Sequence, residues 1–212
     1  MANDGHIKIL KEAVERKDIA EWNRWRKSNR KMEPDLDGAD LSGANLTKAN
    51  LRRAKLWQAD LNEAELYEAN LSNADLRAAK IRKADLTSAN IRAADLRGAD
   101  LKRADLSWAD LTKANLRGAY LKRADLGEAN LRGTDLRGAD LRGAVLEGAA
   151  LEGANLEGAN LERILQCAPS QIRAAQNWGK AFYGEKMLKD LGLPDDHNDR
   201  LQRELSEAQE DD

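Results

Sequence analysis

A leucine or isoleucine recurs at every fifth position of the chain, from Leu36 to Leu161, in twenty-six consecutive repeats. Alanine stands two residues before nearly all of these positions, and aspartate or asparagine stands immediately before most of them. The apolar positions of a helix recur about every 3.6 residues and those of a strand every two. The five-residue period therefore predicts neither element, but short extended segments that are separated by regular turns.

The two apolar positions of each repeat define its geometry. Leucine and the alanine two residues earlier stand in the period-two relation of an extended segment, so both point inward while the other three residues face water. Ten of the 15 glycines occupy the second residue after the leucine, among them Gly38, Gly98 and Gly158, where a tight corner needs permissive dihedral angles. The sequence thus predicts one corner per repeat, and coils that stack by parallel backbone pairing about 4.8 Å apart.

Repeats such as residues 39–43 (ADLSG) and 114–118 (ANLRG) resemble those of the pentapeptide repeat family, in particular its cyanobacterial members. The resemblance covers residues 34–163 of the 212-residue chain. It implies an all-β solenoid, namely a right-handed quadrilateral β-helix with four repeats in each coil. Twenty-six repeats then give about six and a half coils and a rod roughly 30 Å long.

Departures from the repeat are few, and none interrupts the leucines. Pro34 and Thr134 replace alanine. The residues that replace aspartate or asparagine are Lys55, Glu65, Lys80, Tyr120, Val145 and Ala150. We therefore expect neither a bulge nor an inserted loop, and a rod without a pocket.

Both ends of such a rod need a cover, because an open coil exposes leucines and unpaired backbone groups. We expect residues 1–33 to form an N-terminal helical cap, with a break near Lys17 and a second helix that carries Trp22 and Trp25. The repeat array, residues 34–163, begins at a proline that ends any helix. The segment around the two tryptophans also resembles a leader that precedes the repeats in cyanobacterial members of the family.

The C-terminal end is expected to hold a second cap and a tail. Residues 164–192 are predicted as a C-terminal helical cap, in which Ser170 caps a helix and Gly192 ends the apolar pattern. Residues 193–212 form a polar tail that is either a frayed helix or disordered. Two capped ends favour a monomer, whereas proteins that this chain resembles dimerise through a C-terminal helix, so both states stay open.

Composition narrows the classes of function. The chain carries 35 Lys and Arg against 37 Asp and Glu, a balance that commits it to neither a polyanionic nor a polycationic partner. The lone Cys167 excludes an internal disulfide framework, and with neither a secretory signal nor an apolar membrane span we expect a cytoplasmic protein. His6 and His197 have no paired nucleophile, and neither phosphate-loop nor metal-ligand spacing occurs, so we expect no enzyme and no cofactor.

Residues twenty apart are expected to form columns on the surface, and one group of columns is basic. This basic stripe consists of Arg82, Lys83, Lys102, Arg103, Lys122, Arg123 and Arg142. It is either an electropositive surface for an anionic partner or, as we favour, a solvated wall that neighbouring aspartates neutralise. The stripe has no interleaved aromatic residues of the kind that single-stranded nucleic acid binding needs, so nucleic acid is not an expected partner.

Charged residues of neighbouring columns suggest further pairs. We expect salt bridges between coils at Arg132 with Glu152, Arg137 with Glu157 and Arg142 with Glu162. The acidic column Glu65, Asp85, Asp105 and Asp125 is compatible with a ladder of cations. Each aspartate of this column follows a basic residue by two positions, however, so we favour local pairing and no metal.

Four aromatic residues at outward positions are more informative, because such positions rarely need them. They are Trp57, Tyr67, Trp108 and Tyr120. Tyr67 and Trp108 share a face that is rich in serine and threonine and poor in charge, while Trp57 lies under Arg77, where a cation–π contact is expected. Large aromatics in a polar setting are typical of protein interfaces, although each ring here is equally compatible with covering a corner of the rod.

These features predict a non-catalytic rod that binds another protein through one face or through its caps. The alternative is a DNA mimic that modulates a type II topoisomerase, a role that some pentapeptide repeat proteins have. That role needs a strongly negative rod, whereas residues 34–163 carry 20 basic and 21 acidic side chains, so the charge disfavours it. A regulatory role in cyanobacterial development or stress is a third hypothesis, which rests on the resemblance alone.

Overall fold

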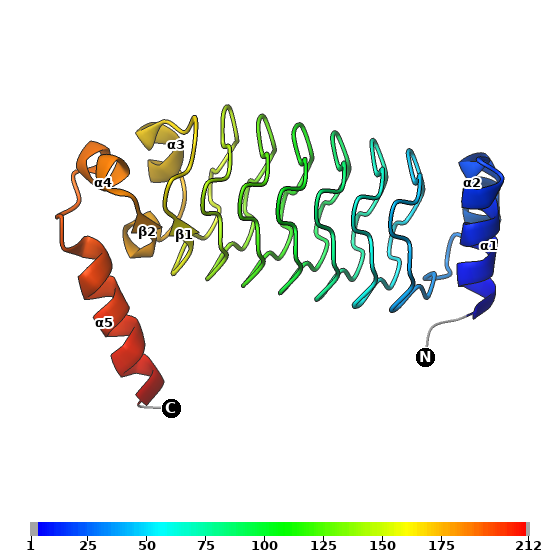
Figure 1. Ribbon diagram of the computed structural model, residues 1–212, viewed down its shortest axis with the longest axis horizontal. Coiled ribbons are helices and arrows are strands. Elements are labelled where there is room, and N and C mark those ends of the chain that lie inside the picture. Colours follow the sequence, from blue (N-terminus) through cyan, green and yellow to red (C-terminus); the bar gives the residue numbers. More distant parts are fainter. Residues whose placement is uncertain (1–3, 211–212) are drawn as a thin grey trace.

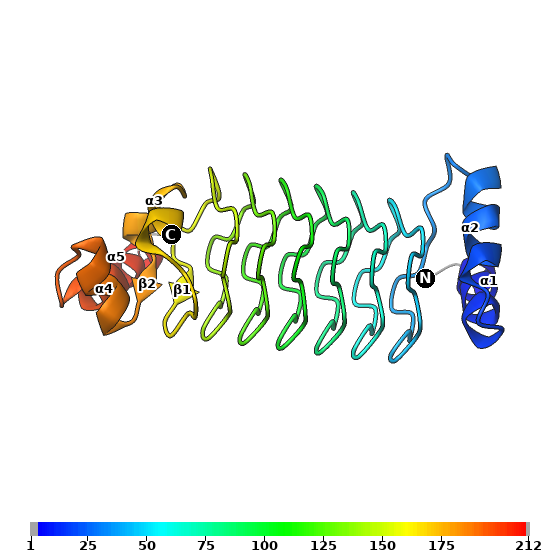
Figure 2. The same cartoon turned by 90° about the horizontal axis from the view of Figure 1, so that it is seen from above.

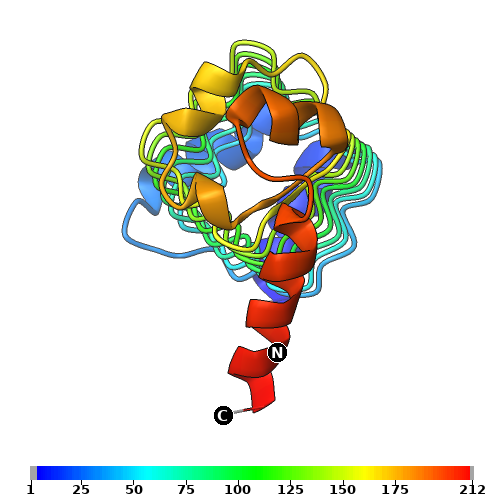
Figure 3. The same cartoon turned by 90° about the vertical axis from the view of Figure 1, so that its left-hand side faces the viewer.

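The computed structural model describes residues 4–210 of the chain. It is a rod of stacked coils with helices at both ends (Figure 1). Isolated parallel bridges join residues twenty positions apart, from Asp35 with Lys55 to Val145 with Leu165, so four repeats complete one coil. Seen along the axis of the rod, successive coils lie over one another (Figure 3). The register runs without a bulge or an inserted loop, as the sequence predicts.

Each repeat uses its backbone polar groups in the same way. The leucine N–H donates to a carbonyl of the next coil, as from Leu36 to Lys55 at 2.8 Å, and the residue before leucine donates to the preceding coil, as from Lys55 to Pro34 at 2.8 Å. The second residue after leucine has a positive φ in all twenty-six repeats. The predicted corner is therefore correct, but sixteen of these residues are not glycine, because the bonds between coils hold them in this less favoured conformation.

The aspartate or asparagine before each leucine stabilises the corner. Its side-chain oxygen accepts the backbone N–H two residues later in an Asx-turn, as from Ser42 to Asp40 at 3.1 Å. Lys55 cannot act in this way, and there Asp37 of the preceding coil accepts the N–H of Trp57 at 2.8 Å instead. Aspartate and asparagine are thus preferred at this position because their side chains bind a backbone N–H of the corner. Exposure to water alone would not explain the preference.

Leucine layers separated by alanine form the core. Every leucine and isoleucine at the five-residue positions from Leu36 to Leu161 is at most 3% exposed. Thr134, which replaces an alanine, is also buried, and its hydroxyl donates to the carbonyl of Leu111 at 2.9 Å. Within the described part of the chain, no buried side-chain nitrogen or oxygen lacks a hydrogen-bond partner.

Two helices, α1 (Asp4–Glu15) and α2 (Ile19–Ser28), lie against the first coil (Figures 1 and 2). Lys17 separates them with a φ of 55°, at the predicted break. The ring of Trp22 is fully buried and stacks on Trp25 with 5.0 Å between ring centroids. The apolar face of this helix pair therefore covers the leucines that the first coil would otherwise expose.

Polar side chains of α2 bind the open backbone edge of the first coil. The indole N–H of Trp22 donates to the carbonyl of Asn50 at 3.0 Å, and Asn23 accepts the N–H of Asn50 at 2.8 Å. Arg26 is only 4% exposed, and its guanidinium donates to the carbonyls of Asn50, Met32 and Arg52 at 3.2, 2.8 and 2.7 Å. Burial, and to a smaller extent the charge of Arg52, lower the pKa of Arg26. These three side chains replace the coil that is missing at this end.

β1 (Asn160–Leu161) lies in the last repeat of the array. The elements that follow it are α3 (Pro169–Arg173), the 3₁₀ turn η1 (Trp178–Lys180), β2 (Phe182–Tyr183), α4 (Glu185–Leu191) and α5 (His197–Glu210). β1 pairs in parallel with β2, which continues the backbone ladder beyond the array. The tail is thus helical up to residue 210, and α5 extends away from the rod (Figure 3). Asn198 of α5 binds both the N–H and the carbonyl of Tyr183, at 3.2 and 2.8 Å.

One of the two helix boundaries predicted for this end is wrong. α3 begins at Pro169, and Ser170 does not cap it; instead the side chain of Gln171 accepts the N–H of Ala168 at 2.8 Å. Proline is favoured at the first helical position because its fixed φ suits a helix and its missing N–H is not needed there. Gly192 ends α4 with a φ of 72°, as predicted.

Arginines clamp the corner aspartates on two of the walls. Arg77, Arg97, Arg137 and Arg142 each bind the aspartate two residues earlier, at 2.6 to 2.7 Å. The hydrogen bond from arginine lowers the pKa of its partner at Asp75, Asp135 and Asp140. The pairs are exposed, so each contributes at most about 1 kcal/mol.

Arg26→Met should destabilise the protein by about 3 kcal/mol, because it leaves three carbonyls without a charged donor. The measurement is urea-induced unfolding followed by circular dichroism. Arg24→Met is the matched control, since Arg24 lies on the same helix and makes only an exposed salt bridge with Asp18 at 3.2 Å. Its cost should stay below about 1 kcal/mol. Equal losses in the two variants would contradict the role assigned to Arg26.

Acid should remove the contribution of the arginine clamps. An unfolded aspartate has a pKa of about 3.9, and the clamped ones titrate lower, so their stabilisation is complete above that pH and is lost as pH falls through the folded pKa. Asp140→Asn keeps the turn, because other repeats use asparagine there, but it removes the ion pair. Its stability should fall at pH 7 and match the wild type near pH 2. Asp85→Asn, at an aspartate without a clamp, should change less at pH 7; the opposite order would refute the clamp.

Candidate interaction surfaces

All four aromatic residues predicted to be exposed are exposed. Trp108 stands out with 65% of its surface accessible, against 47% for Tyr120, 43% for Trp57 and 38% for Tyr67. Trp108 occupies the corner position with positive φ, where it is the only aromatic residue of the array. A role for these four residues in protein binding stays a prediction.

The expected contact between Trp57 and Arg77 is not formed in the described structure. Arg77 is instead held by Asp75, with its Nε and Nη2 at 2.7 and 2.6 Å from the carboxylate oxygens. The cation–π contact of the rod lies elsewhere, between Lys102 Nζ and the ring of Tyr120, at 4.6 Å from the centroid. Arg77 thus binds the carboxylate of Asp75, two residues away in the chain, and not the ring of Trp57 in the neighbouring coil.

Four of the seven residues of the basic stripe form salt bridges. Arg82 and Lys102 share Asp100 at 2.6 and 3.2 Å, Lys83 binds Glu63 at 2.7 Å, and Arg142 binds its own Asp140. The other members are Arg103, Lys122 and Arg123, which form no salt bridge with residues 4–210. Lys122, Arg123 and Arg142 line a shallow hollow of about 240 Å³ together with Arg163 and Glu162.

Only one of the three expected bridges between arginine and glutamate is confirmed. Arg132 binds Glu152 at 3.1 Å. Arg137 and Arg142 bind Asp135 and Asp140 instead, at 2.6 and 2.7 Å. The turns already fix those aspartates. Pairing with them therefore immobilises fewer rotatable side-chain bonds, and costs less conformational entropy, than pairing with a glutamate of another coil.

The wall that carries Tyr67 and Trp108 is acidic, and the expectation that it is poor in charge is wrong. Its central column holds Glu65, Asp85, Asp105 and Asp125, and its corners add Glu68, Glu128 and Glu147. We refer to the wall formed by these residues, with Tyr67 and Trp108, as the acidic wall. Lys48 lies at the same corner as Glu68 and binds it at 3.4 Å. The corner on the other side of the wall carries basic residues, namely Lys83, Arg103 and Arg123.

The aspartates of the acidic wall lack the partners expected for them. Lys83 turns to Glu63, and Asp85, Asp105 and Asp125 form no salt bridge within the described residues. The residue after leucine is arginine at the clamped corners, whereas in the repeats of these three aspartates it is threonine, serine and glycine. No three His, Cys, Asp or Glu side chains in the described part are grouped so that they could hold a metal ion.

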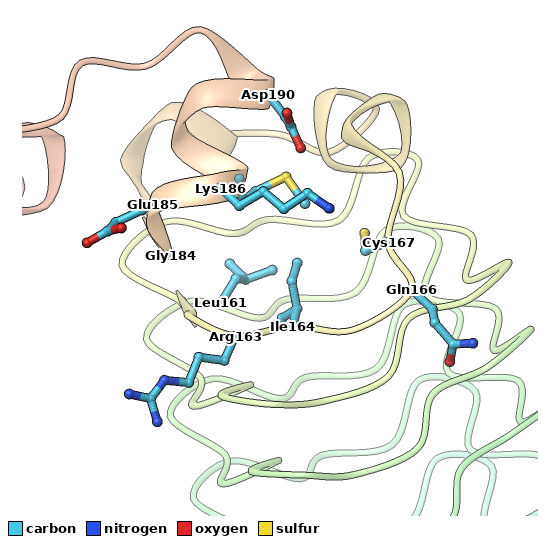
Figure 4. Close-up of a pocket in the computed structure, with 10 residues that line it drawn as sticks. Leu161, Arg163, Ile164, Gln166, Cys167, Gly184, Glu185, Lys186 and Asp190 are labelled. Carbon is cyan, nitrogen blue, oxygen red and sulfur yellow. The ribbon is translucent and has the colours of Figure 1, made fainter.

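The expectation of a rod without pockets is also wrong, because both ends and two of the walls are hollowed. A cavity of about 420 Å³ lies between the last coil and α4 (Figure 4). Leu161 and Ile164 point into it from the coil, opposite Lys186 of α4, and Cys167 lies at its edge. Met187 of α4 also lines it. Burial raises the pKa of the Cys167 thiol to about 11, so the thiol is protonated near neutral pH and is a poor nucleophile.

A second hollow, of about 380 Å³, lies beside Trp108 on the acidic wall. Its lining residues are Ser107, Trp108, Asp125, Gly127, Glu128, Val145, Glu147 and Gln166. Sequence reasoning named Trp108 as a candidate interaction residue, Asp125 only as a member of the acidic column, and Val145 only as a departure from the repeat. A signal for Gly127 was also present, since it is the one glycine directly after the leucine of a repeat.

A larger hollow of about 630 Å³ lies where the N-terminal helices meet the first coils. Val14 and Ile19 line it from the helices, and Thr47 and Glu65 line it from the repeats.

None of the helices within residues 4–210 has the length and apolarity that crossing a bilayer requires.

The chain is similar to known proteins that contain such repeats. Rfr23, a pentapeptide repeat protein from the cyanobacterium Cyanothece 51142, is 33% identical over 51% of this chain and 63% of its own, with a TM-score of 0.36. The match thus spans less than two thirds of that protein. HetL, a pentapeptide repeat protein involved in heterocyst differentiation regulation in Nostoc sp. strain PCC 7120, is 35% identical over 69% of this chain and 77% of its own, with a TM-score of 0.29.

More distant similarity extends to QnrB1, a plasmid-mediated fluoroquinolone resistance protein. A trypsin-treated form is 21% identical over 73% of this chain and 83% of its own, with a TM-score of 0.39. None of the curated proteins matches the chain in sequence. The low TM-scores give the superpositions no weight, so the relationship rests on the repeats.

The repeats themselves are matched along the whole array. The family described as "Pentapeptide repeats (8 copies)" matches residues 34–62, 58–92, 89–127 and 124–163, which together make up more than half of the chain. The chain therefore belongs to the pentapeptide repeat family, whose fold is a right-handed β-helix.

Proposed function

We propose that the protein is a non-catalytic scaffold that binds another protein through its acidic wall, with Tyr67 and Trp108 as anchors. The observation that carries this proposal is Trp108, a tryptophan that is 65% exposed at a corner with a φ of 61°. A bulky residue with positive φ is unfavourable, and an exposed indole adds nothing to the core. Tryptophan and tyrosine are enriched among the residues that dominate binding energy at protein interfaces.

The titratable groups outside the rod support a non-catalytic role. Nδ1 of His6 accepts the N–H of Asp35 at 3.1 Å, and His197 is buried with Nε2 at 3.0 Å from the carbonyl of Ala181. Both histidines thus join a terminal segment to its neighbours. With the Cys167 thiol protonated, no nucleophile next to a base is found among the described residues.

The finer architecture belongs to the same proposal. We infer a quadrilateral rod of about six and a half coils, capped by residues 1–33 and 164–192, in a cytoplasmic protein. Arg26 supports the first cap by binding three carbonyls, and Gln171 supports the second by donating to the carbonyls of Leu146 and Ala149 at 3.0 and 2.8 Å. Capped ends prevent rods from joining end to end, which leaves the walls for binding.

A DNA mimic for a type II topoisomerase remains the second candidate. QnrB1 is a fluoroquinolone resistance protein, but its similarity extends to the fold alone. A duplex presents negative charge on all sides, whereas on this rod clamped aspartates such as Asp75 and Asp140 are neutralised on two of the other walls. One acidic wall with exposed rings fits a protein partner better.

Affinity capture from native lysate tests the scaffold. The wild type should retain a partner that a Tyr67→Ser/Trp108→Ser double variant loses, because the substitutions remove both anchors from the acidic wall. A Trp57→Ser/Tyr120→Ser variant is the matched control, since it removes two exposed rings from other walls. Circular dichroism should show all three proteins to be folded alike. Retention by the first variant, or loss in the control alone, would move the binding site off this wall.

A further inference from the structure

Three departures from the repeat converge in the hollow beside Trp108. Trp108, Gly127 and Val145 lie on three successive coils of the acidic wall, and all three line the hollow. The N–H of Trp108 donates to the carbonyl of Gly127 at 2.9 Å, and the N–H of Glu128 donates to Glu147 at 2.7 Å, so the three corners are stacked directly. Three unusual residues, the first and last of them nearly forty positions apart in the chain, thus lie next to one another on the surface.

Gly127 opens this hollow. It is the only glycine directly after a leucine in the twenty-six repeats, and its φ is not positive, so the backbone conformation does not require glycine there. A Cβ at this position would lie 3.1 Å from Oδ1 of Asp125, which accepts the N–H of Gly127 at 2.9 Å. Any side chain at residue 127 would therefore occupy space that is now free beside Asp125.

Val145 and Trp108 give the hollow apolar surfaces. Val145 takes the place of the aspartate or asparagine of other repeats, and it pairs with Asp125 in the coil below. The indole of Trp108 stands at the edge of the same space. The volume of about 380 Å³ lies within the range of roughly 300–1,000 Å³ that is typical of ligand pockets.

The rim of the hollow carries negative charge without a counter-charge. Asp125, Glu128 and Glu147 line it, no basic residue does, and none of the three forms a salt bridge within residues 4–210. Arg123, two residues before Asp125, lines a different hollow with Lys122. At clamped corners an arginine after the leucine neutralises the aspartate, and beside Asp125 that position is occupied by Gly127.

We propose that the hollow beside Trp108 receives an arginine side chain from a basic segment of the protein partner. The planar guanidinium stacks on the indole of Trp108 and donates to the carboxylates of Asp125, Glu128 and Glu147. The partner's arginine thereby supplies from outside the charge that Arg77 or Arg137 supplies from within the chain on other walls. This inference rests on the proposed function and names the chemistry of the partner.

A hexa-arginine peptide with blocked ends is the probe. Its binding is followed through the ¹H–¹⁵N indole signal of Trp108, which is identified by its loss in Trp108→Ala. Gly127→Arg places a guanidinium in the hollow within the chain, at a position where other repeats carry arginine. Thr87→Arg is the matched control, since it makes the same charge change at the equivalent corner of the acidic wall, two coils away.

The wild type should show a saturable shift of the Trp108 signal. Gly127→Arg should weaken binding at least about tenfold, which corresponds to about 1.4 kcal/mol, and Thr87→Arg less than about threefold. Hexalysine, matched in charge, should bind at least about threefold more weakly, because an ammonium group cannot stack. Equal weakening by the two arginine variants, equal binding of hexalysine, or no shift in the wild type would each overturn the inference.

The scaffold proposal and this inference fail differently. A captured partner that is lost with Tyr67→Ser/Trp108→Ser but kept by Gly127→Arg would leave the scaffold standing and reject the arginine pocket. A captured partner that is still retained by Tyr67→Ser/Trp108→Ser would reject the acidic wall as the binding site, regardless of the result with the hexa-arginine peptide.

Discussion

Hydrogen bonding between coils joins each repeat to the repeat twenty residues away, and every other feature of the rod depends on this register. The N–H groups of leucine and of the residue before it both bind neighbouring coils, so neither position can move without breaking two ladders. Because side chains alternate between inside and outside, inserting a single residue would turn the following leucines toward water. The register therefore accounts for the absence of any insertion between Leu36 and Leu161 in the chain.

A consequence of this register is that the surface is organised in columns and not along the chain. Backbone bonds are satisfied in the same way at every coil, so the outward residues are free to vary without changing the fold. Two of the four walls use that freedom to neutralise themselves, by placing arginine after the leucine and aspartate before it. The acidic wall does not, and its charge is left for the solvent or for another molecule.

The sequence alone predicts those parts that follow from backbone requirements. The five-residue period, the corner with positive φ, the break at Lys17, the end of α4 at Gly192 and the exposure of the aromatic residues all have local causes that single residues reveal. The sequence does not predict which partner a long charged side chain binds. Arg137 has Asp135 and Glu157 within reach, and only the fixed geometry of the Asx-turn decides in favour of Asp135. The same reason explains why the acidic wall and its hollows were not foreseen.

Arg26 shows a further limit of reading the sequence by hydrophobic pattern. It stands four residues after Trp22, on the apolar face of α2, which is a signal that a buried charge has a specific task. That task is set by the open backbone edge of the first coil, and the edge exists only once the array is folded. Asn198 solves the same problem for Tyr183 at the other end, again through side-chain groups that replace a strand.

Departures from the repeat differ in whether the surrounding columns absorb them. Tyr120 replaces an aspartate or asparagine singly, and Lys102 of the coil below covers its ring at 4.6 Å. Thr134 replaces an alanine singly, and a carbonyl inside the core accepts its hydroxyl. Beside Trp108, by contrast, no neighbouring side chain among residues 4–210 covers the unusual residues. A residue larger than glycine at position 127 would fill the space beside the carboxylates, and Gly127 leaves that space open. In a solenoid, function is therefore best sought where unusual residues share a column and leave one another uncovered.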